Sequence, residues 1–102
     1  MNSRTGAIDP MTIQTIQACL DTQFRDVTFD QKIRPTFTFH HGDHKLSWLL
    51  VMHEEFFADQ MSREELWQFI DAKVIKKILQ NPGKRIQVSK YWDVTVEERI
   101  HS

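Results

Sequence analysis

The part of the chain that most constrains its fold is residues 33–52, which have the pattern of one β-hairpin. Apolar and polar residues alternate on both sides of Gly42 and Asp43, and such alternation is typical of strands with one buried face. Glycine at the first central position tolerates the positive φ of a type II′ turn, so a two-residue loop fits this place. The pairs that this turn predicts are Phe37 with Trp48, Phe39 with Leu46, and His41 with His44.

The same register predicts which residues share each face of the sheet, because side chains alternate along a strand. One face is apolar throughout and is expected to be the core side; it carries Phe37, Phe39, Leu46, Trp48, Leu50 and Met52. The opposite face is polar near the turn and apolar toward the base of the hairpin. Its predicted members are Thr36, Thr38, His40, Lys45, Ser47, Leu49 and Val51.

Two amphipathic helices are expected to cover the core side. Residues 12–24 repeat apolar side chains at helical spacing, with glutamine and aspartate between them. The second helix, over residues 63–80, begins at a capping box in which Ser62 and Glu65 satisfy free backbone N–H groups. Residues 81–83, Asn-Pro-Gly, are expected to end this helix and turn the chain.

Further strands follow from shorter alternating stretches. Residues 84–92 alternate except at Lys90 and predict a third strand, and residues 94–96 predict a short fourth one. Residues 26–30 fit an edge strand or a linker equally well. The order α-β-β-α-β predicts an α+β domain with a mainly antiparallel sheet of three to four strands and two helices on one face. A right-handed crossover through the second helix would let the third strand lie beside the first.

Length and composition predict one ordinary globular domain. The chain has 102 residues, of which 40% are hydrophobic and 26% charged, so neither a disordered nor a fibrous class is indicated. Residues 1–10 lack periodicity and are expected to be a flexible or artificial leader before a single domain over residues 11–102. The longest apolar run is far shorter than a membrane span. With Cys19 as its one cysteine and no secretory signal, the chain is expected to be cytoplasmic.

The histidine-rich tip of the hairpin is the one place where metal chemistry is conceivable from the sequence. His41 and His44 are predicted to be a cross-strand pair, with His40, Asp43 and His53 nearby. Zinc requires three or four ligands held tetrahedrally, and a two-residue turn presents about two. No established metal-binding spacing is present. We therefore expect a solvated hairpin end, no metal site and no cofactor.

A basic segment gives one alternative function, nucleic-acid binding. Residues 73–92 contain no acid, and cations beside aromatic rings suit single-stranded nucleic acid. Lysines at the end of a helix also complement its dipole without any ligand, and the formal net charge of −1 gives no general attraction to a polyanion. The residues of this alternative are Lys73, Lys76, Lys77, Lys84, Arg85, Lys90, Tyr91 and Trp92.

The outer face of the sheet gives the leading interpretation, which is a small non-enzymatic interaction or regulatory protein that binds a protein partner or a second copy of itself. Leu49 and Val51 would be exposed there, inside a polar surround, and such a patch is typical of an interface. A small-molecule pocket lined by Trp48, Phe57 and Trp67 is a further alternative. No catalytic group is expected, because His53, Glu54 and Glu55 lie in a predicted solvated loop. The predicted partner-binding residues are Thr36, Thr38, Ser47, Leu49, Val51, Gln87 and Tyr91.

Overall fold

The computed structural model describes residues 9–31, 33–42, 47–58 and 62–97. Two of its helical turns are irregular: η1 is a 3₁₀ helix and η2 is a π-helical turn. The elements are α1 Pro10–Asp21, β1 Arg25–Asp30, β2 Thr36–His40, β3 Trp48–Met52, η1 Glu54–Ala58, α2 Arg63–Phe69, η2 Ile70–Ile75, α3 Lys76–Gln80, β4 Arg85–Val88 and β5 Val94–Glu97.

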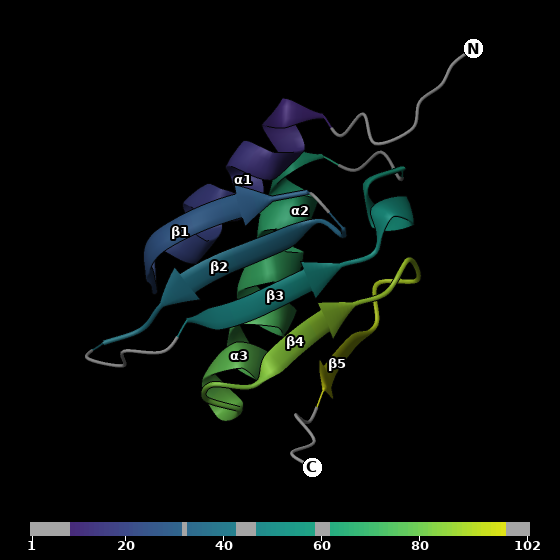
Figure 1. Ribbon diagram of the computed structural model, residues 1–102. Coiled ribbons are helices and arrows are strands. Elements are labelled where there is room, and N and C mark those ends of the chain that lie inside the picture. Colours follow the sequence, from purple (N-terminus) through teal and green to yellow (C-terminus); the bar gives the residue numbers. More distant parts are fainter. Residues whose placement is uncertain (1–8, 32, 43–46, 59–61, 98–102) are drawn as a thin grey trace.

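The molecule has two layers, with all of the long helices on one face of a five-stranded sheet (Figure 1). The strands lie in the order β1-β2-β3-β4-β5. All neighbours are antiparallel except β3 and β4, which are parallel and are joined through α2, η2 and α3. The predicted α+β class and the placement of the helices on one face are confirmed. No helix in the described ranges is long and apolar enough to span a membrane.

The first helix begins earlier than its apolar pattern predicts. The Asp9 carboxylate accepts a hydrogen bond from the Met11 backbone N–H at 3.0 Å, and Pro10 occupies the first helical position, where a missing N–H costs nothing. The helix ends at Asp21, so Phe24 is buried beyond its end. Asp9 and Pro10, which the sequence assigns to the leader, are therefore the cap and the first residue of α1.

The second predicted helix, residues 63–80, is one helical stretch made of α2, η2 and α3. The capping box is confirmed, since Ser62 Oγ accepts from the Glu65 N–H at 3.1 Å and Glu65 Oε1 accepts from the Ser62 N–H at 3.1 Å. The π-helical turn was not predicted. Because its hydrogen bonds span five residues, it brings Ile75 onto the face of Ile70, and both side chains are buried.

Two aromatic clusters close the core at its ends. At one end, the Phe24 ring lies 4.6 Å from Phe39 and 6.0 Å from Trp48, measured between centroids. At the other end, the Trp92 ring packs 5.4 Å from Phe56 and 5.1 Å from Phe69. The first cluster joins α1 to the hairpin, and the second joins the β4–β5 connection to α2. The predicted core side is confirmed for its described members, all of them buried: Phe37, Phe39, Trp48, Leu50 and Met52.

The predicted hairpin register is wrong by two residues. Phe37 pairs with Leu50 instead of Trp48, and Phe39 pairs with Trp48 instead of Leu46. Gly42 has the expected positive φ of 61°, and the described part of the ladder ends at the Phe39–Trp48 pair. Residues 43–46, including Leu46 and His44, lie outside the described residues. An even shift leaves every side chain on its predicted face.

The strand count and order also differ from the prediction. Residues 26–30, whose sequence fits an edge strand or a linker equally well, belong to β1. This strand lies at one edge of the sheet. With β5, the sheet has five strands, and the order is α-β-β-β-α-β-β. β4 lies beside β3 and not beside the first strand of the hairpin. The physical reason is that β1 already occupies the free edge of β2, which leaves only β3 available for pairing.

The predicted strand over residues 84–92 is shorter than expected, because β4 ends at Val88. Ser89 stops it: its hydroxyl accepts hydrogen bonds from the N–H groups of Tyr91 and Asp93 at 3.1 and 3.2 Å, as serine commonly does in turns. Trp92 has a positive φ of 70° and turns its ring into the core cluster. Tyr91 is therefore in a turn and not on the sheet face.

The burial of the aromatic cluster gives the first testable prediction. Trp48 is 3% exposed and Trp67 is 36% exposed. Replacing Trp48 with alanine should lower the free energy of unfolding by about 3 to 5 kcal/mol, because a large cavity forms in the core. Replacing Trp67 with alanine is the matched control and should cost about 1 kcal/mol or less. Urea denaturation followed by circular dichroism measures both. Equal losses in the two variants would contradict the assigned core.

Candidate functional site

The outer face of the sheet is the surface that the helices leave uncovered. Because side chains alternate, β2 places Thr36 and Thr38 there, while Leu49 and Val51 project there from β3. A groove of about 660 Å³ crosses this face, and we call it the outer groove. Its lining residues are Asp30, Ile33, Arg34, Thr36, Thr38, Leu49, Val51, Arg85, Gln87 and Glu97.

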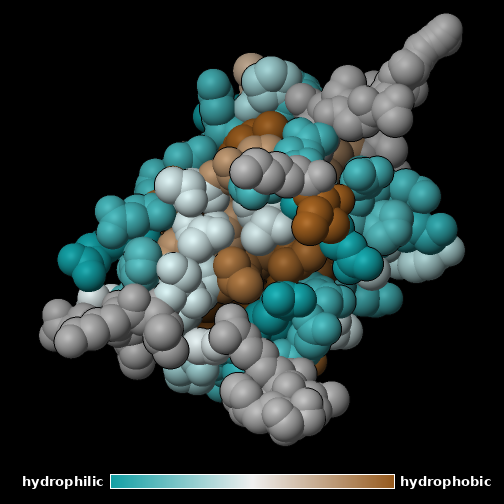
Figure 2. Space-filling view, viewed as in Figure 1, coloured by the Kyte–Doolittle hydropathy of each residue, from teal (hydrophilic) through white to brown (hydrophobic). Residues whose placement is uncertain are grey.

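The floor of the outer groove is apolar and its rim is polar. Figure 2 shows brown, hydrophobic surface in the middle of this face with teal, hydrophilic surface around it. Leu49 is half-buried, and Val51 is 9% exposed, so Val51 is less exposed than the sequence suggested. Ile33 is 87% exposed, the largest value among the exposed large apolar side chains of the described residues. A contiguous patch of this kind favours contact with another molecule.

Charged groups of both signs lie on the rim. Glu97 Oε1 accepts hydrogen bonds from Arg85 Nη1 at 3.1 Å and from Gln87 Nε2 at 2.8 Å, which ties β5 to β4 across the outer face. Within the described ranges, the Arg34 guanidinium forms no ion pair or hydrogen bond. The rim therefore presents a neutralised cluster on one side and an unneutralised cation on the other.

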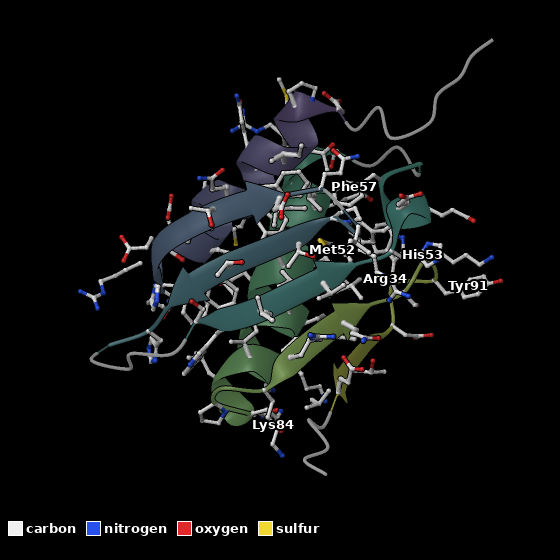
Figure 3. The ribbon with its side chains drawn as sticks, in the orientation of Figure 1. Arg34, Met52, His53, Phe57, Lys84 and Tyr91 are labelled. Carbon is white, nitrogen blue, oxygen red and sulfur yellow. The ribbon has the colours of Figure 1, made fainter. Side chains whose placement is uncertain are left out.

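A smaller hollow of about 330 Å³ continues the groove past the carboxyl ends of β3 and β4. It shares Ile33, Arg34, Val51 and Gln87 with the outer groove and adds His53; Figure 3 shows Arg34 and His53 at this end of the sheet. The His53 Nδ1 atom accepts a hydrogen bond from the Glu55 N–H at 3.0 Å. His53 thus serves as a cap for η1, a structural role that occupies one ring nitrogen.

Two of the predicted partner-binding residues do not line the outer groove. Ser47 precedes β3, and its Oγ lies 3.3 Å from His40 Nε2. Tyr91 is 73% exposed in the β4–β5 turn, with the Lys90 ammonium 5.2 Å from its ring centroid, and it extends away from the sheet in Figure 3. The remaining predicted members do line the groove: Thr36, Thr38, Leu49, Val51 and Gln87.

The histidines of the hairpin tip do not converge in the described residues. His40 Nδ1 lies 3.7 Å from the Asp26 carboxylate, whereas the His41 ring packs 5.1 Å from Trp48 and 5.4 Å from Phe24. The predicted partner His44, with Asp43, is outside the described residues. Within the described ranges, no group of three or more histidine, cysteine or acidic side chains is arranged to hold a metal ion.

Asp26, His40 and Ser47 form a sequence-distant arrangement that the hairpin pattern did not predict. The order of groups is that of a catalytic triad, but the distance of 3.7 Å from His40 Nδ1 to Asp26 Oδ2 exceeds a hydrogen bond. The Asp26 side chain is also 75% exposed, so water competes for its carboxylate. A triad requires a buried acid that holds the imidazole in one orientation, and this group does not provide one.

The predicted basic segment is divided among several surfaces. Lys73, Lys76 and Lys77 line a hollow between the helix and β5. Arg85 lies on the opposite face, where it pairs with Glu97, and Lys90 pairs with Glu55 at 3.7 Å. Figure 3 shows Lys84 and Tyr91 at opposite ends of β4. The segment is therefore not one nucleic-acid surface, and Trp92 is packed in the core cluster.

The predicted aromatic pocket is not formed by its three residues. Trp48 belongs to the cluster with Phe24, while the Phe57 ring contacts Phe56 beyond the other end of β3. Trp67 is on α2 and is partly exposed. None of the three lines the two hollows on the outer side of the sheet. For the outer groove, the sequence did offer one signal: an isolated apolar residue, Ile33, in a loop beside Arg34.

Cys19 lies on the inner side of α1 and is fully buried. Its Sγ lies 3.8 Å from the Trp67 carbonyl oxygen. Burial, with a smaller contribution from the negative charge of Asp71, raises the pKa of the Cys19 thiol from 9.0 to about 12. The reactive thiolate is therefore scarce at neutral pH.

Comparison of this chain with protein-family models, curated proteins and solved structures finds no match. A functional assignment must therefore be argued from the geometry of the chain itself.

The raised pKa of Cys19 predicts a loss of stability in alkali. The folded state holds the thiol neutral up to about pH 12, whereas the unfolded chain loses that proton at the ordinary pKa of 9.0. The free energy of unfolding should therefore be unaffected by this group below pH 9 and should fall as the pH rises above it. Cys19→Ala is the control and should lack this part of the slope. Denaturant titrations between neutral and alkaline pH measure the difference, and identical slopes would contradict the assignment.

Proposed function

We propose that this chain is a small non-enzymatic interaction protein that self-associates through the outer groove. The observation that carries the proposal is the uncovered sheet face: every long helix packs on the inner side, and the outer side keeps an apolar floor open. Sheets of this class bury one face in their own domain. An apolar second face is expected to be covered by something else.

The exposure of Ile33 favours a protein interface on this face rather than a partly polar surface that faces solvent. At 87% exposed, this side chain gains nothing from its own domain, and it stands at the rim of the groove whose floor includes Leu49 and Val51. Apolar groups at the centre with polar groups around them are typical of protein interfaces. A partner that covered the groove would bury Ile33 together with the floor.

The charges on the rim favour a second copy as the partner. A two-fold interface brings the same surface together with itself, so it must be self-complementary. The rim carries acids and bases at once, with Asp30 and Glu97 beside Arg34 and Arg85. A two-fold axis through the groove would allow Arg34 of one protomer to approach the Arg85–Glu97 cluster of the other and share its carboxylate. A face with charges of one sign would instead repel its copy.

The alternative functions have weaker support in the geometry. The cations of the nucleic-acid alternative are distributed over different surfaces, and the residues of the aromatic-pocket alternative belong to different clusters. The hollow beside Arg34 and His53 is the better location for a small molecule, but it is continuous with the outer groove. A protein that covered the groove would cover this hollow as well.

Self-association is tested by sedimentation equilibrium. The wild-type protein should sediment as a dimer of about 24 kDa, twice the 12.1 kDa of one chain. Leu49→Lys with Val51→Lys should shift it to the monomer, because two charges would be buried at the centre of the interface. Ile33→Lys should weaken the dimer in the same direction. Ile33 is almost fully exposed, so its substitution cannot act by disrupting the core.

The matched control places the same charges on the helix layer. Gln14 and Ala18 are exposed on α1, and Gln14→Lys with Ala18→Lys should leave the dimer intact. Circular dichroism checks that each variant remains folded. A wild-type protein that stays monomeric at high micromolar concentration, or one whose dimer survives Ile33→Lys and the Leu49 and Val51 changes, would overturn the proposal.

A further inference from the structure

We propose a second interaction site at the free edge of β5, which accepts an acidic, extended segment of another protein as an added strand. The site consists of the β5 backbone and a row of three lysines, Lys73, Lys76 and Lys77, that we call the lysine row. It lies on the helix side of the sheet edge, so it is separate from the outer groove.

Among the described residues, the outward backbone groups of β5 have no strand partner. The Ser89 N–H donates to the Asp93 carbonyl at 2.9 Å, which marks Ser89 and Asp93 as a hydrogen-bonded pair. Such pairs alternate along an antiparallel ladder, so Thr95 directs its backbone groups toward β4. Val94 and Val96 direct theirs to the outside. In the described part of the chain, β4 is the sole strand that pairs with β5.

The other edge of the sheet, at β1, is protected against strand addition. β5 is therefore the edge at which a partner strand can be added. In β1 the register shifts between Arg25 and Thr28, and Asp26 within this bulge has a positive φ of 55°. Bulges and charged residues are the usual devices that prevent strand addition. β5 has no register shift, and its residues at the free edge are valines. An incoming strand would therefore pair regularly with β5.

The lysine row determines the chemistry of the partner. Its members are three and four positions apart and so project from one side of the helix. They line a hollow of about 500 Å³ together with Trp92, Asp93 and Val94. Within the described ranges, none of the three ammonium groups forms an ion pair. An added strand with acidic side chains facing the helix layer would neutralise them, while its backbone paired with β5.

Two other occupants fit this edge less well. A second copy that paired β5 with β5 would bring two lysine rows together, and like charges oppose that arrangement. Single-stranded nucleic acid requires rings on which bases stack. Trp92 is packed against Phe56 and Phe69, and Tyr91 is in the turn beyond the edge. The edge therefore offers backbone hydrogen bonds and positive charge, which is what an acidic strand requires.

The test uses a fluorescein-labelled peptide in which glutamate alternates with threonine and valine. Fluorescence anisotropy should show saturable binding that weakens with added salt. On binding, hydrogen exchange at the Val94 and Val96 amides should slow. Lys73→Glu with Lys76→Glu should weaken binding by about tenfold or more. Arg63→Glu with Lys90→Glu carries the same change in net charge away from the edge and should alter affinity by about twofold or less.

Two further variants separate strand addition from simple charge attraction. Val96→Pro removes an outward N–H and spares the ladder to β4, a position where an edge strand tolerates proline; it should abolish binding. The peptide with alternate N-methyl groups makes the same test without altering the protein. The site is independent of self-association, so Leu49→Lys with Val51→Lys should leave peptide binding unchanged. Binding insensitive to N-methylation, or tighter binding of oligothymidylate than of the acidic peptide, would overturn the proposal.

Discussion

Burial of the inner face of β2 and β3 beneath the helices is the interaction on which the remaining structure depends. Phe37, Phe39, Leu50 and Met52 are fully buried there, and large apolar side chains of this kind contribute about 1.5 to 3 kcal/mol each on leaving water. The aromatic clusters then attach the outlying parts to this centre: Phe24 anchors the end of α1, and Trp92 anchors the β4–β5 connection. Removal of the hairpin face would leave both helices without a partner.

One-sided burial has a consequence for function. Because the helices pack on a single face, the other face of a five-stranded sheet is left to the solvent or to a partner. That face contains an apolar floor and a mixed rim, whereas the sheet edges differ from each other: β1 is bulged and charged, and β5 is regular. The two proposed interaction sites arise from these two surfaces. They use different residues, so each can be tested while the other is intact.

The sequence predicted the helices and the faces of the hairpin better than the pairing of its strands. The capping box at Ser62 and the Asn-Pro-Gly stop act locally, so their residues identify the ends of the helical stretch without knowledge of the fold. The register was wrong by two residues, yet Phe37 and Trp48 stayed on the core side because an even shift conserves both faces. The turn at Ser89 was missed, although the break in alternation at Lys90 marked it.

For the candidate site, alternation alone identified Leu49 and Val51, and these residues do lie on the uncovered face. Their burial, the contribution of Ile33 and Arg34, and the separation of the lysine row from Arg85 were decided by tertiary structure. The reason is physical. Alternation and capping depend on neighbours in the sequence, which the chain itself records. Strand order, the position of β4 beside β3 and the groups that meet across a groove depend on which distant surfaces bury the most apolar area together, and only the folded chain determines that.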